Sequence, residues 1–290
     1  MLVPRNQVTR ESVEVDGVPA SYLTAGDGPV VLMLHGTYWS RVWLPVLGDV
    51  AAAGLRPIAV DLPGFGRSGG ELTPDSATVP ALADWVVRFL TALGHDGPIG
   101  VAGHDIGGAI AQHLLVSGGV DVRALALVNA VTYDSWPAPG VARFQDPDVV
   151  AATSTQDLLA VRREAVSTAL GRSATNARVT EYIDPLTDPR VARSWLALAA
   201  AAHSQYTLGL LSALRASPTP KLLVWGEEDP FQKIRYAERF AAEIPGTTLL
   251  RIAGASHIPM ENDSGAVAHA LAEFFGAHVG RSAHGEPGHR

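Results

Sequence analysis

The fold of this chain is decided by the stretch Gly103-His104-Asp105-Ile106-Gly107-Gly108. It follows an apolar run at 98–103, which predicts a buried strand, and it opens a helical pattern over 107–116. Small residues on both sides of Asp105 are typical of a tight strand-to-helix turn that pushes its central side chain into a cleft. That position usually holds a nucleophilic serine, and here it holds an aspartate. The stretch alone leaves two roles open for Asp105, a nucleophile or an ordinary helix N-cap.

Strands and helices alternate on both sides of this stretch. Further apolar runs, each typical of a strand buried on both faces, lie at 30–34, 56–61, 123–129, 221–226 and 247–254. Helical patterns lie at 39–53, 79–93, 233–244 and 264–275. This alternation predicts an α/β fold, with right-handed crossovers and a mostly parallel sheet flanked by helices. An earlier pair of segments, at 12–17 and 20–26, predicts an antiparallel hairpin at the edge of the sheet.

The alternation stops after the strand that ends near Asn129. Residues 132–217 contain polar helical patterns and several prolines but no strand pattern, which predicts a helical cap over the carboxyl edge of the sheet, where open α/β sheets bind their ligands. The expected organisation is a core formed by 1–131 and 218–275, a cap of 132–217, and a disordered tail of 276–290.

The composition excludes several classes of protein. The 290 residues are 47% hydrophobic and 18% charged, which is enough apolar material for a large core. The net charge of −7 argues against a nucleic-acid-binding protein, and the lack of cysteine excludes disulfides, zinc–thiolate sites and a thiol nucleophile. No signal peptide is visible, and the longest apolar run, at 196–202, is too short to cross a membrane. We therefore expect a cytoplasmic protein.

Three more segments carry chemically useful residues at predicted strand ends. His35-Gly36-Thr37 follows the strand at 30–34, so the backbone amides of Thr37 and Ile106 are candidates for an oxyanion hole. An acidic segment, Gly226-Glu227-Glu228-Asp229-Pro230, follows the strand at 221–226, and Gly254-Ala255-Ser256-His257 follows the next strand. The chain order is therefore nucleophile, acid, histidine, as in the catalytic triads of one large α/β fold.

With these segments in that order, the sequence resembles the α/β-hydrolase superfamily over nearly all of its length outside the cap. The Gly-His-Asp-x-Gly-Gly turn is similar to that of the epoxide hydrolases and haloalkane dehalogenases, which use an aspartate nucleophile. The resemblance implies that Asp105 is the nucleophile, His257 the base and Asp229 the acid, with Glu227 and Glu228 as less favoured replacements for the acid. It also implies a small-molecule substrate and no cofactor or metal.

The leaving group is the open question. The resembled haloalkane dehalogenases have Trp directly after the nucleophile and Asn or Glu after His-Gly, where this chain has Ile106 and Thr37. Epoxide hydrolases of the family protonate the departing oxygen with tyrosines of the cap, and Tyr206 is the candidate here. They also usually have His-Gly-x-Pro, which this chain lacks. Epoxide hydrolysis to a diol is the expected activity, with dehalogenation, ester hydrolysis and non-catalytic ligand binding as alternatives.

Aromatic residues predict a pocket for a bulky or cyclic substrate, although ordinary core packing is the alternative for each of them. The candidates are Tyr38, Trp39, Trp136, Tyr182 and Phe231. The sequence carries no feature that specifies an oligomeric state.

One motif is typical of a different function, the binding of a dinucleotide. The segment Gly64-Phe65-Gly66-Arg67-Ser68-Gly69 matches the dinucleotide-binding pattern, and Asp84 lies downstream at a fitting distance. A dinucleotide site requires a helix that begins at those glycines, and here residues 70–74 include Gly70 and Pro74, which disfavour one. We therefore expect a loop and no bound nucleotide.

Overall fold

A single eight-stranded sheet forms the centre of the molecule in the computed structural model, which describes residues 7–279. The strands are β1 (Thr9–Val15), β2 (Val18–Thr24), β3 (Val30–Leu34), β4 (Arg56–Val60), β5 (Ile99–Asp105), β6 (Val122–Ala130), β7 (Lys221–Gly226) and β8 (Thr247–Ile252). Their spatial order is β1-β2-β4-β3-β5-β6-β7-β8. Strands β3 to β8 are parallel, and β1 and β2 form the predicted antiparallel hairpin at one edge. The predicted α/β-hydrolase fold, with its mostly parallel sheet, is confirmed.

The order of the strands places the site. The chain leaves β3 for β4 on one side and later returns to β5 on the other side of β3. Such a switch point opens a crevice at the carboxyl ends of the two strands. Thr37 follows β3 and Asp105 ends β5, so the fold brings both to this crevice.

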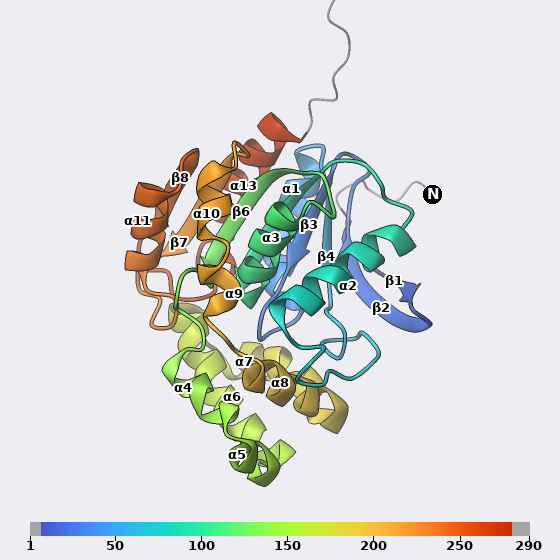
Figure 1. Ribbon diagram of the computed structural model, residues 1–290, viewed down its shortest axis with the longest axis vertical. Helices are drawn as coiled ribbons and strands as arrows, with labels where there is room; N and C mark the ends of the chain where they lie inside the picture. The colour runs from blue at the N-terminus through green and yellow to red at the C-terminus, as the bar shows by residue number, and fades with distance from the viewer. Residues whose placement is uncertain (1–6, 280–290) are drawn as a thin grey trace, which may run out of the picture.

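Helices cover the two faces of the sheet. They are α1 (Leu44–Ala52), α2 (Val79–Ala92), α3 (Ile106–Ser117), α11 (Ile234–Glu243), α12 (Pro259–Asn262) and α13 (Ser264–His278). Helices α1 and α13 pack together behind the sheet in the view of Figure 1, and α2 and α3 pack together in front of it. The helix expected over 39–53 starts with a 3-10 turn at Ser40–Trp43, and the α-helix begins at Leu44, next to a proline.

The C-terminal helix is longer than expected. Residues 276–278, which we assigned to a disordered tail, continue α13 to His278. The reason is packing, because Phe275 and Val279 are both buried against β5. A Cβ on Gly100 would lie 2.4 Å from the Phe275 ring and 3.1 Å from Val279. The rest of that expected tail, residues 280–290, lies outside the described residues.

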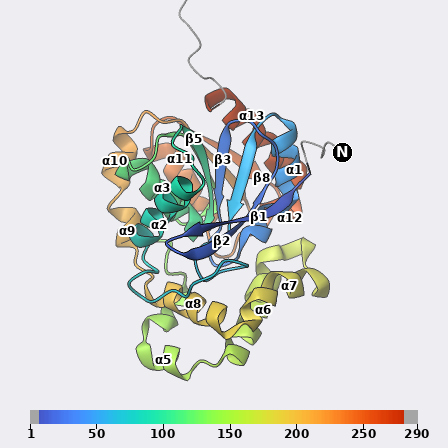
Figure 2. The ribbon, with the colours of Figure 1, turned by 90° about the vertical axis from the view of Figure 1, so that its right-hand side faces the viewer.

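Seven α-helices and three short 3-10 helices lie between β6 and β7. The α-helices are α4 (Pro139–Ala142), α5 (Pro147–Ala152), α6 (Thr155–Leu170), α7 (Asn176–Ile183), α8 (Pro189–Ala200), α9 (Gln205–Leu208) and α10 (Leu211–Ala216). Helices α4 to α8 gather at one end of the sheet, and we call them the helical layer (Figures 1 and 2). Helices α9 and α10 return along the sheet and contact α3. The division into core and cap domains at residues 131 and 217 stays a prediction.

Helix α6 joins the helical layer to the loop after β8, because its Thr168 and Ala169 carbonyls accept from the Ser256 hydroxyl (3.1 Å) and the Ile258 amide (3.2 Å). Its start is fixed by a capping box, in which Ser154 Oγ accepts from the Asp157 amide (3.1 Å) and Asp157 Oδ2 accepts from the Ser154 amide (3.3 Å). Its buried residues recur at helical spacing and include one charged side chain: Leu158, Arg162, Val166, Ala169 and Leu170.

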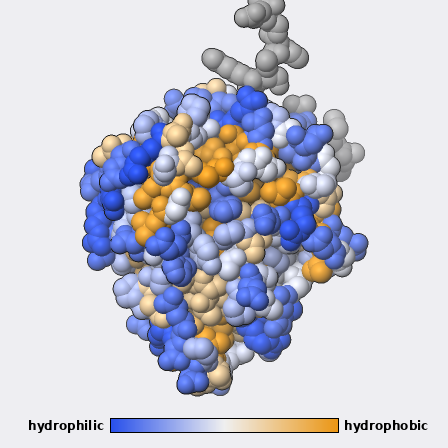
Figure 3. Space-filling model, viewed as in Figure 1, coloured by the Kyte–Doolittle hydropathy of each residue, from blue (hydrophilic) through white to orange (hydrophobic). Residues whose placement is uncertain are grey.

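Apolar residues are not confined to the interior. Figure 3 shows hydrophilic residues around much of the rim of one face, with apolar residues gathered over its upper centre. Apolar atoms make up a large share of the surface of any folded protein, so we assign this area no role.

Candidate active site

Asp105 occupies a backbone conformation that keeps its side chain out of the helix that follows. Its φ is +54° and its ψ is −127°, a combination that costs a non-glycine residue on the order of 1–3 kcal/mol. The turn closes tightly, because a Cβ on Gly103 would lie 2.4 Å from the Gly107 carbonyl oxygen and one on Gly107 would lie 2.3 Å from the Leu34 carbonyl oxygen. The glycines around Asp105 are therefore required by space.

The carboxylate of Asp105 is held by one oxygen only. Its Oδ2 accepts hydrogen bonds from the backbone amide of Thr37 (2.9 Å) and from the Thr37 hydroxyl (2.8 Å). No hydrogen bond from residues 7–279 reaches Oδ1. The two oxygens are therefore distinct, and Oδ1 is available to attack a bound molecule.

The second amide expected in the oxyanion hole belongs to Ile106, the first residue of α3. The first amides of a helix have no partner inside it. A Cβ on Gly36 would lie 2.5 Å from the Ile106 nitrogen and 2.6 Å from Asp105 Oδ2, so these atoms border the same small space. Glycine at position 36 leaves that space open.

His257 and Asp229 form a buried pair beside Asp105. His257 Nδ1 donates to Asp229 Oδ2 over 2.8 Å, which leaves Nε2 of the imidazole as the free base. The Oδ1 atom of Asp229 accepts from the amides of Phe231 (2.8 Å) and Gln232 (3.0 Å). The neighbouring Glu227 and Glu228 are exposed, so Asp229 is the acid of this segment that contacts the histidine.

Asn129 positions the acid and was not singled out from the sequence. Its Nδ2 donates to Asp229 Oδ2 (2.6 Å) and its Oδ1 accepts from the Gly226 amide (2.9 Å). It is fully buried, and its φ of +42° is one that asparagine tolerates better than most residues. Its position at the end of β6 was the one available sign of this role.

Electrostatics prepare His257 to take a proton. Burial alone would lower its pKa, but the charge and hydrogen bond of Asp229, followed by the charge of Asp105, raise the pKa above its usual value. The charge of Arg162 acts in the opposite direction. A raised pKa makes His257 a stronger base, which suits the removal of a proton from water.

Two other histidines are structural parts of the site. Burial and the charge of His257 lower the pKa of His104 to about 3, so this ring is neutral and its Nε2–H donates to the His257 carbonyl (2.8 Å). The ring of His35 accepts from the Leu62 amide through Nε2 (2.9 Å), so its Nδ1–H donates to the Gly36 carbonyl (2.9 Å). Both rings fix backbone segments that carry the site.

A cavity of about 330 Å³ contains Asp105 and His257. We call it the catalytic pocket. Its sheet side is formed by Thr37, Tyr38 and Phe231, and the opposite wall comes from the helical layer and the loop before it. Apart from a few polar groups the walls are aromatic or aliphatic: Trp136, Ala138, Pro139, Val141, Phe144, Val161, Ala165, Trp195 and Pro230. Such a pocket suits a compact apolar molecule.

Some of the predicted pocket residues line this cavity and others do not. Tyr38, Trp136 and Phe231 do. Trp39 and Tyr182 instead border a much smaller void next to it. The Tyr182 hydroxyl donates to Glu261 (3.0 Å), and Arg41 lies over its ring, so packing between the layers holds Tyr182 away from the catalytic pocket.

Tyr206 is not among the residues that line the catalytic pocket, so this geometry does not support the predicted role of its hydroxyl in protonating a leaving oxygen. Tyr206 lies in the short helix α9, which contacts α3. The next residue, Thr207, donates to the Tyr133 carbonyl and so ties α9 to the loop after β6. Tyr38 is the tyrosine that lines the pocket, and its ring centroid lies 5.8 Å from that of His257.

Sequence reasoning also missed Arg162, which lines the catalytic pocket from α6. Its Nη2 donates to the Thr37 carbonyl (3.2 Å). A signal was present in the sequence, because Arg162 stands four residues after Leu158 and four before Val166, on the buried face of its helix. A charged residue in such a position needs an explanation.

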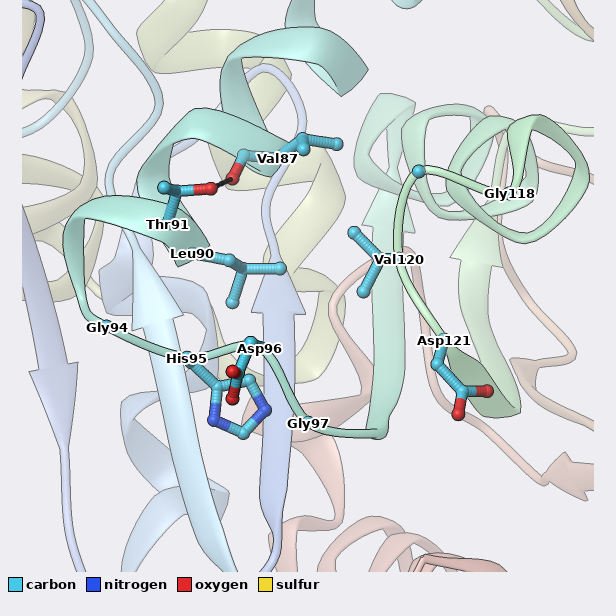
Figure 4. A pocket seen from close by; sticks show the side chains of 11 residues that line it. Val87, Leu90, Thr91, Gly94, His95, Asp96, Gly97, Gly118, Val120 and Asp121 are labelled. Carbon is cyan, nitrogen blue, oxygen red and sulfur yellow. Dashed lines mark hydrogen bonds between the residues drawn. The ribbon is translucent and has the colours of Figure 1, made fainter.

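A second hollow, of about 420 Å³, lies at the other end of the sheet. Figure 4 shows His95, Asp96 and Asp121 among its lining residues, together with the end of α2. These residues precede β5 and β6, whereas Asp105 ends β5, roughly 20 Å along the strand. This hollow therefore plays no part in the chemistry of Asp105.

The other expectations from the sequence concern a nucleotide, a metal ion and a membrane. The Gly64–Gly69 motif lies in a loop, and the next helix, α2, begins only at Val79. Among residues 7–279, no group of three or more His, Asp or Glu side chains is arranged to hold a metal ion. Over the same residues, no helix has the length and apolar character to cross a membrane.

Comparisons with known proteins agree with this architecture. The chain is 27% identical over 270 residues to the AB hydrolase superfamily protein YfhM of Bacillus subtilis, covering 84% of this chain and 90% of that protein. It is 29% identical over 280 residues to a haloalkane dehalogenase of Bradyrhizobium diazoefficiens, covering 86% and 87%. Polyketide synthase ThaQ of Burkholderia thailandensis is 30% identical over 272 residues, which are 89% of this chain and 12% of that much longer protein.

Solved structures show the same fold. The epoxide hydrolase CorEH superposes with a TM-score of 0.79 at 22% identity, covering 93% of this chain and 99% of that one. The haloalkane dehalogenase DbeA from Bradyrhizobium elkani gives a TM-score of 0.82 at 23% identity, covering 93% and 98%. A family model described as the alpha/beta hydrolase family matches residues 31–270. Because that match spans most of the chain, this protein belongs to the alpha/beta hydrolase family.

Proposed function

We propose that this hydrolase opens an epoxide to a diol through a covalent ester on Asp105. The observation that carries the proposal is the asymmetric Asp105 carboxylate. Thr37 holds Oδ2 with two hydrogen bonds, Oδ1 has none from the described residues, and Asp105 lines a mostly apolar pocket. A carboxylate attacks an sp³ carbon, whereas the more usual serine of this fold attacks a carbonyl carbon.

In the first step, Asp105 Oδ1 forms a bond to one epoxide carbon. The bond between that carbon and the epoxide oxygen breaks, and its electron pair goes to the oxygen, which takes up a proton. Tyr38 is our candidate for the donor, because it is the tyrosine that lines the pocket. Burial raises the pKa of Tyr38, so its hydroxyl is protonated when the substrate binds. The product of this step is a hydroxyalkyl ester of Asp105.

In the second step, His257 Nε2 removes a proton from water, and the hydroxide adds to Cγ of Asp105. Negative charge then develops on Oδ2, which Thr37 already holds through its amide and hydroxyl. The Asp229 carboxylate stabilises the imidazolium through the 2.8 Å contact with Nδ1. Collapse of the intermediate breaks the bond from Cγ to the alkyl oxygen. That oxygen takes a proton from His257, and the diol leaves. Collapse leaves Asp105 as a carboxylic acid, and its proton returns to the Tyr38 phenolate, so that both groups regain their starting state.

The residue that follows Asp105 favours epoxides over alkyl halides as substrates, although Arg162 and Trp195 bring side-chain donors to another wall of the pocket. A departing halide needs donors placed beside it, and the residue after the nucleophile is Ile106, which has no side-chain donor. Dehalogenation is a second candidate function, because a haloalkane dehalogenase is 29% identical to this chain over most of both chains. The pocket volume of about 330 Å³ favours a compact, cyclic or aryl-substituted substrate of either class.

A substrate panel tests the proposal. Purified protein is incubated with aryl and alicyclic epoxides, short and long haloalkanes, haloacids and simple esters, and is assayed for diol, halide and acid. We expect diol from at least one epoxide and little halide from any haloalkane. Fast halide release without epoxide turnover would replace the proposal by dehalogenation, and rapid ester hydrolysis alone would point to an esterase.

A further inference from the structure

Arg162 is a buried cation without a carboxylate partner. Its exposed fraction is 6%, and no ion pair within 4 Å joins it to an acid among residues 7–279. The other buried arginine, Arg41, contacts Glu181 and Glu261, both at 2.8 Å. A buried charge is normally paired, because removing an ion from water is costly. Arg162 therefore lacks the counter-charge that Arg41 has. The buried Lys221 also has no acid beside it, but its Nζ donates to three backbone carbonyls, those of Ser217, Thr219 and Pro245.

The protein holds the guanidinium in place but uses only part of its donors. Nη2 donates to the Thr37 carbonyl (3.2 Å) and lies 3.5 Å from the Thr37 hydroxyl. The guanidinium carbon lies 4.9 Å from the Trp195 ring centroid and 5.3 Å from that of Tyr38. Nε is buried and has no hydrogen-bond partner within residues 7–279. The group is thus fixed by an aromatic clamp while donor capacity remains.

Arg162 also borders the catalytic pocket, and it is the only arginine or lysine among the described residues that line it. On the same helix, Val161 and Ala165 give the wall beside it an apolar character. A molecule with an apolar body and one anionic end would fill the pocket and supply the missing counter-charge.

We propose that the substrate carries a carboxylate and that Arg162 binds it, so that the enzyme acts on an epoxide of a hydrophobic carboxylic acid. The inference rests on the proposed function for its reactive group but not for its anionic end. The planar guanidinium suits a carboxylate, and hydrogen bonds between such charged groups are among the stronger ones in proteins. Repulsion between the substrate carboxylate and the Asp105 carboxylate is reduced, because Thr37 donates twice to Oδ2 of Asp105 and the Arg162 guanidinium lies next to the same threonine.

A different role for Arg162 would be to hold the departing oxygen or halide. In that case the cation would act on a charge that exists only during the reaction, and neutral substrates would need it as much as acidic ones. The two roles separate on binding of an unreactive acid, which has a permanent charge and no leaving group.

The first arm of the test measures binding without turnover. Phenylacetate and its neutral counterpart phenylacetamide are titrated against the whole protein, with tryptophan fluorescence and calorimetry as readouts. We expect the acid to bind roughly 10- to 100-fold more tightly than the amide. Arg162→Leu should remove this preference and Arg162→Lys should keep part of it. Arg163→Leu is the matched control, since Arg163 is the next residue of α6 and is exposed. Circular dichroism and thermal melting verify that each variant folds.

The second arm measures turnover of an epoxy acid and its methyl ester. We expect Arg162→Leu to lower kcat/KM for the acid far more than for the ester. Equal losses for both, with no preference of the wild type for phenylacetate, would overturn the inference in favour of the leaving-group role. Equal binding of acid and amide by the wild type would also overturn it. Selective, Arg162-dependent phenylacetate binding without turnover of any epoxide would support the anion site and reject the epoxide chemistry.

Discussion

The sheet edge and the helical layer meet in one pocket, but they build their halves of it differently. At the sheet edge, Asp105 ends β5, and Thr37 and His257 lie in the loops after β3 and β8. Their partners are a backbone amide, a hydroxyl and the buried Asp229 carboxylate in the loop after β7. The helical layer contributes Phe144, Trp195 and other apolar walls, with one charged group. In the proposed mechanism, the chemistry therefore depends on fixed backbone on one side of the pocket, and selection among substrates depends on side-chain packing on the other.

The largest loss of activity is expected from a substitution at the sheet edge. Asp105→Asn should reduce turnover by about 10⁴-fold or more, because an amide oxygen is a poor nucleophile. Folding should be unaffected, because an amide has nearly the shape of the carboxylate. Initial rates on freshly purified protein measure the effect, since slow hydrolysis of the amide would restore Asp. A fresh variant with substantial activity would contradict a nucleophilic role.

A smaller effect is expected where the two halves meet. Tyr38→Phe should slow formation of the ester by about 10²-fold, as the loss of one catalytic donor does elsewhere. Tyr206→Phe is the matched control and should leave the rate unchanged, because α9 lies away from the catalytic pocket. Pre-steady-state measurement of ester formation distinguishes the two. The reverse result would return the role to Tyr206.

The smallest predicted effect is a shift in pH dependence. His257 must be neutral to accept a proton, and Asp229 raises its pKa above the usual value. Ester hydrolysis in the wild type should therefore fall off as the pH drops through this raised pKa. Asp229→Asn removes the raising charge, so the acid limb should move to lower pH while the maximal rate falls. Single-turnover rates across pH measure this. A limb that stays in place or moves to higher pH would contradict the assignment.

The sheet edge could be predicted from the sequence more fully than the helical layer, for the same structural reason. The turn at Asp105 can be predicted from the sequence because the small residues that it requires for steric reasons are close together in the chain. The strands can be predicted because both of their faces are buried, which makes them continuous apolar runs. The hydroxyl of Thr37 was not anticipated as a ligand of Asp105, because a motif predicts only backbone donors there. Its contact depends on a side-chain rotamer across two strands.

The helical layer was less predictable. Tyr206 was placed in the pocket because of its position late in the inserted segment, but the chain has already returned to α3 at that point. Arg162 was overlooked although its spacing from Leu158 and Val166 marks it as buried. Packing between helices that are distant in the sequence decides which side chains face the pocket, and periodicity predicts only which face of each helix is covered.

Isotope labelling in a single turnover tests the central claim most directly. Excess enzyme is mixed with an epoxide substrate in ¹⁸O-enriched water, and the first diol formed is analysed by mass spectrometry. If Asp105 attacks carbon, the new oxygen of that diol comes from the carboxylate, so the first product is unlabelled and ¹⁸O appears in the peptide that contains Asp105. If His257 instead activates water for direct attack on the epoxide, the first diol carries ¹⁸O and the peptide does not, which would contradict the covalent mechanism.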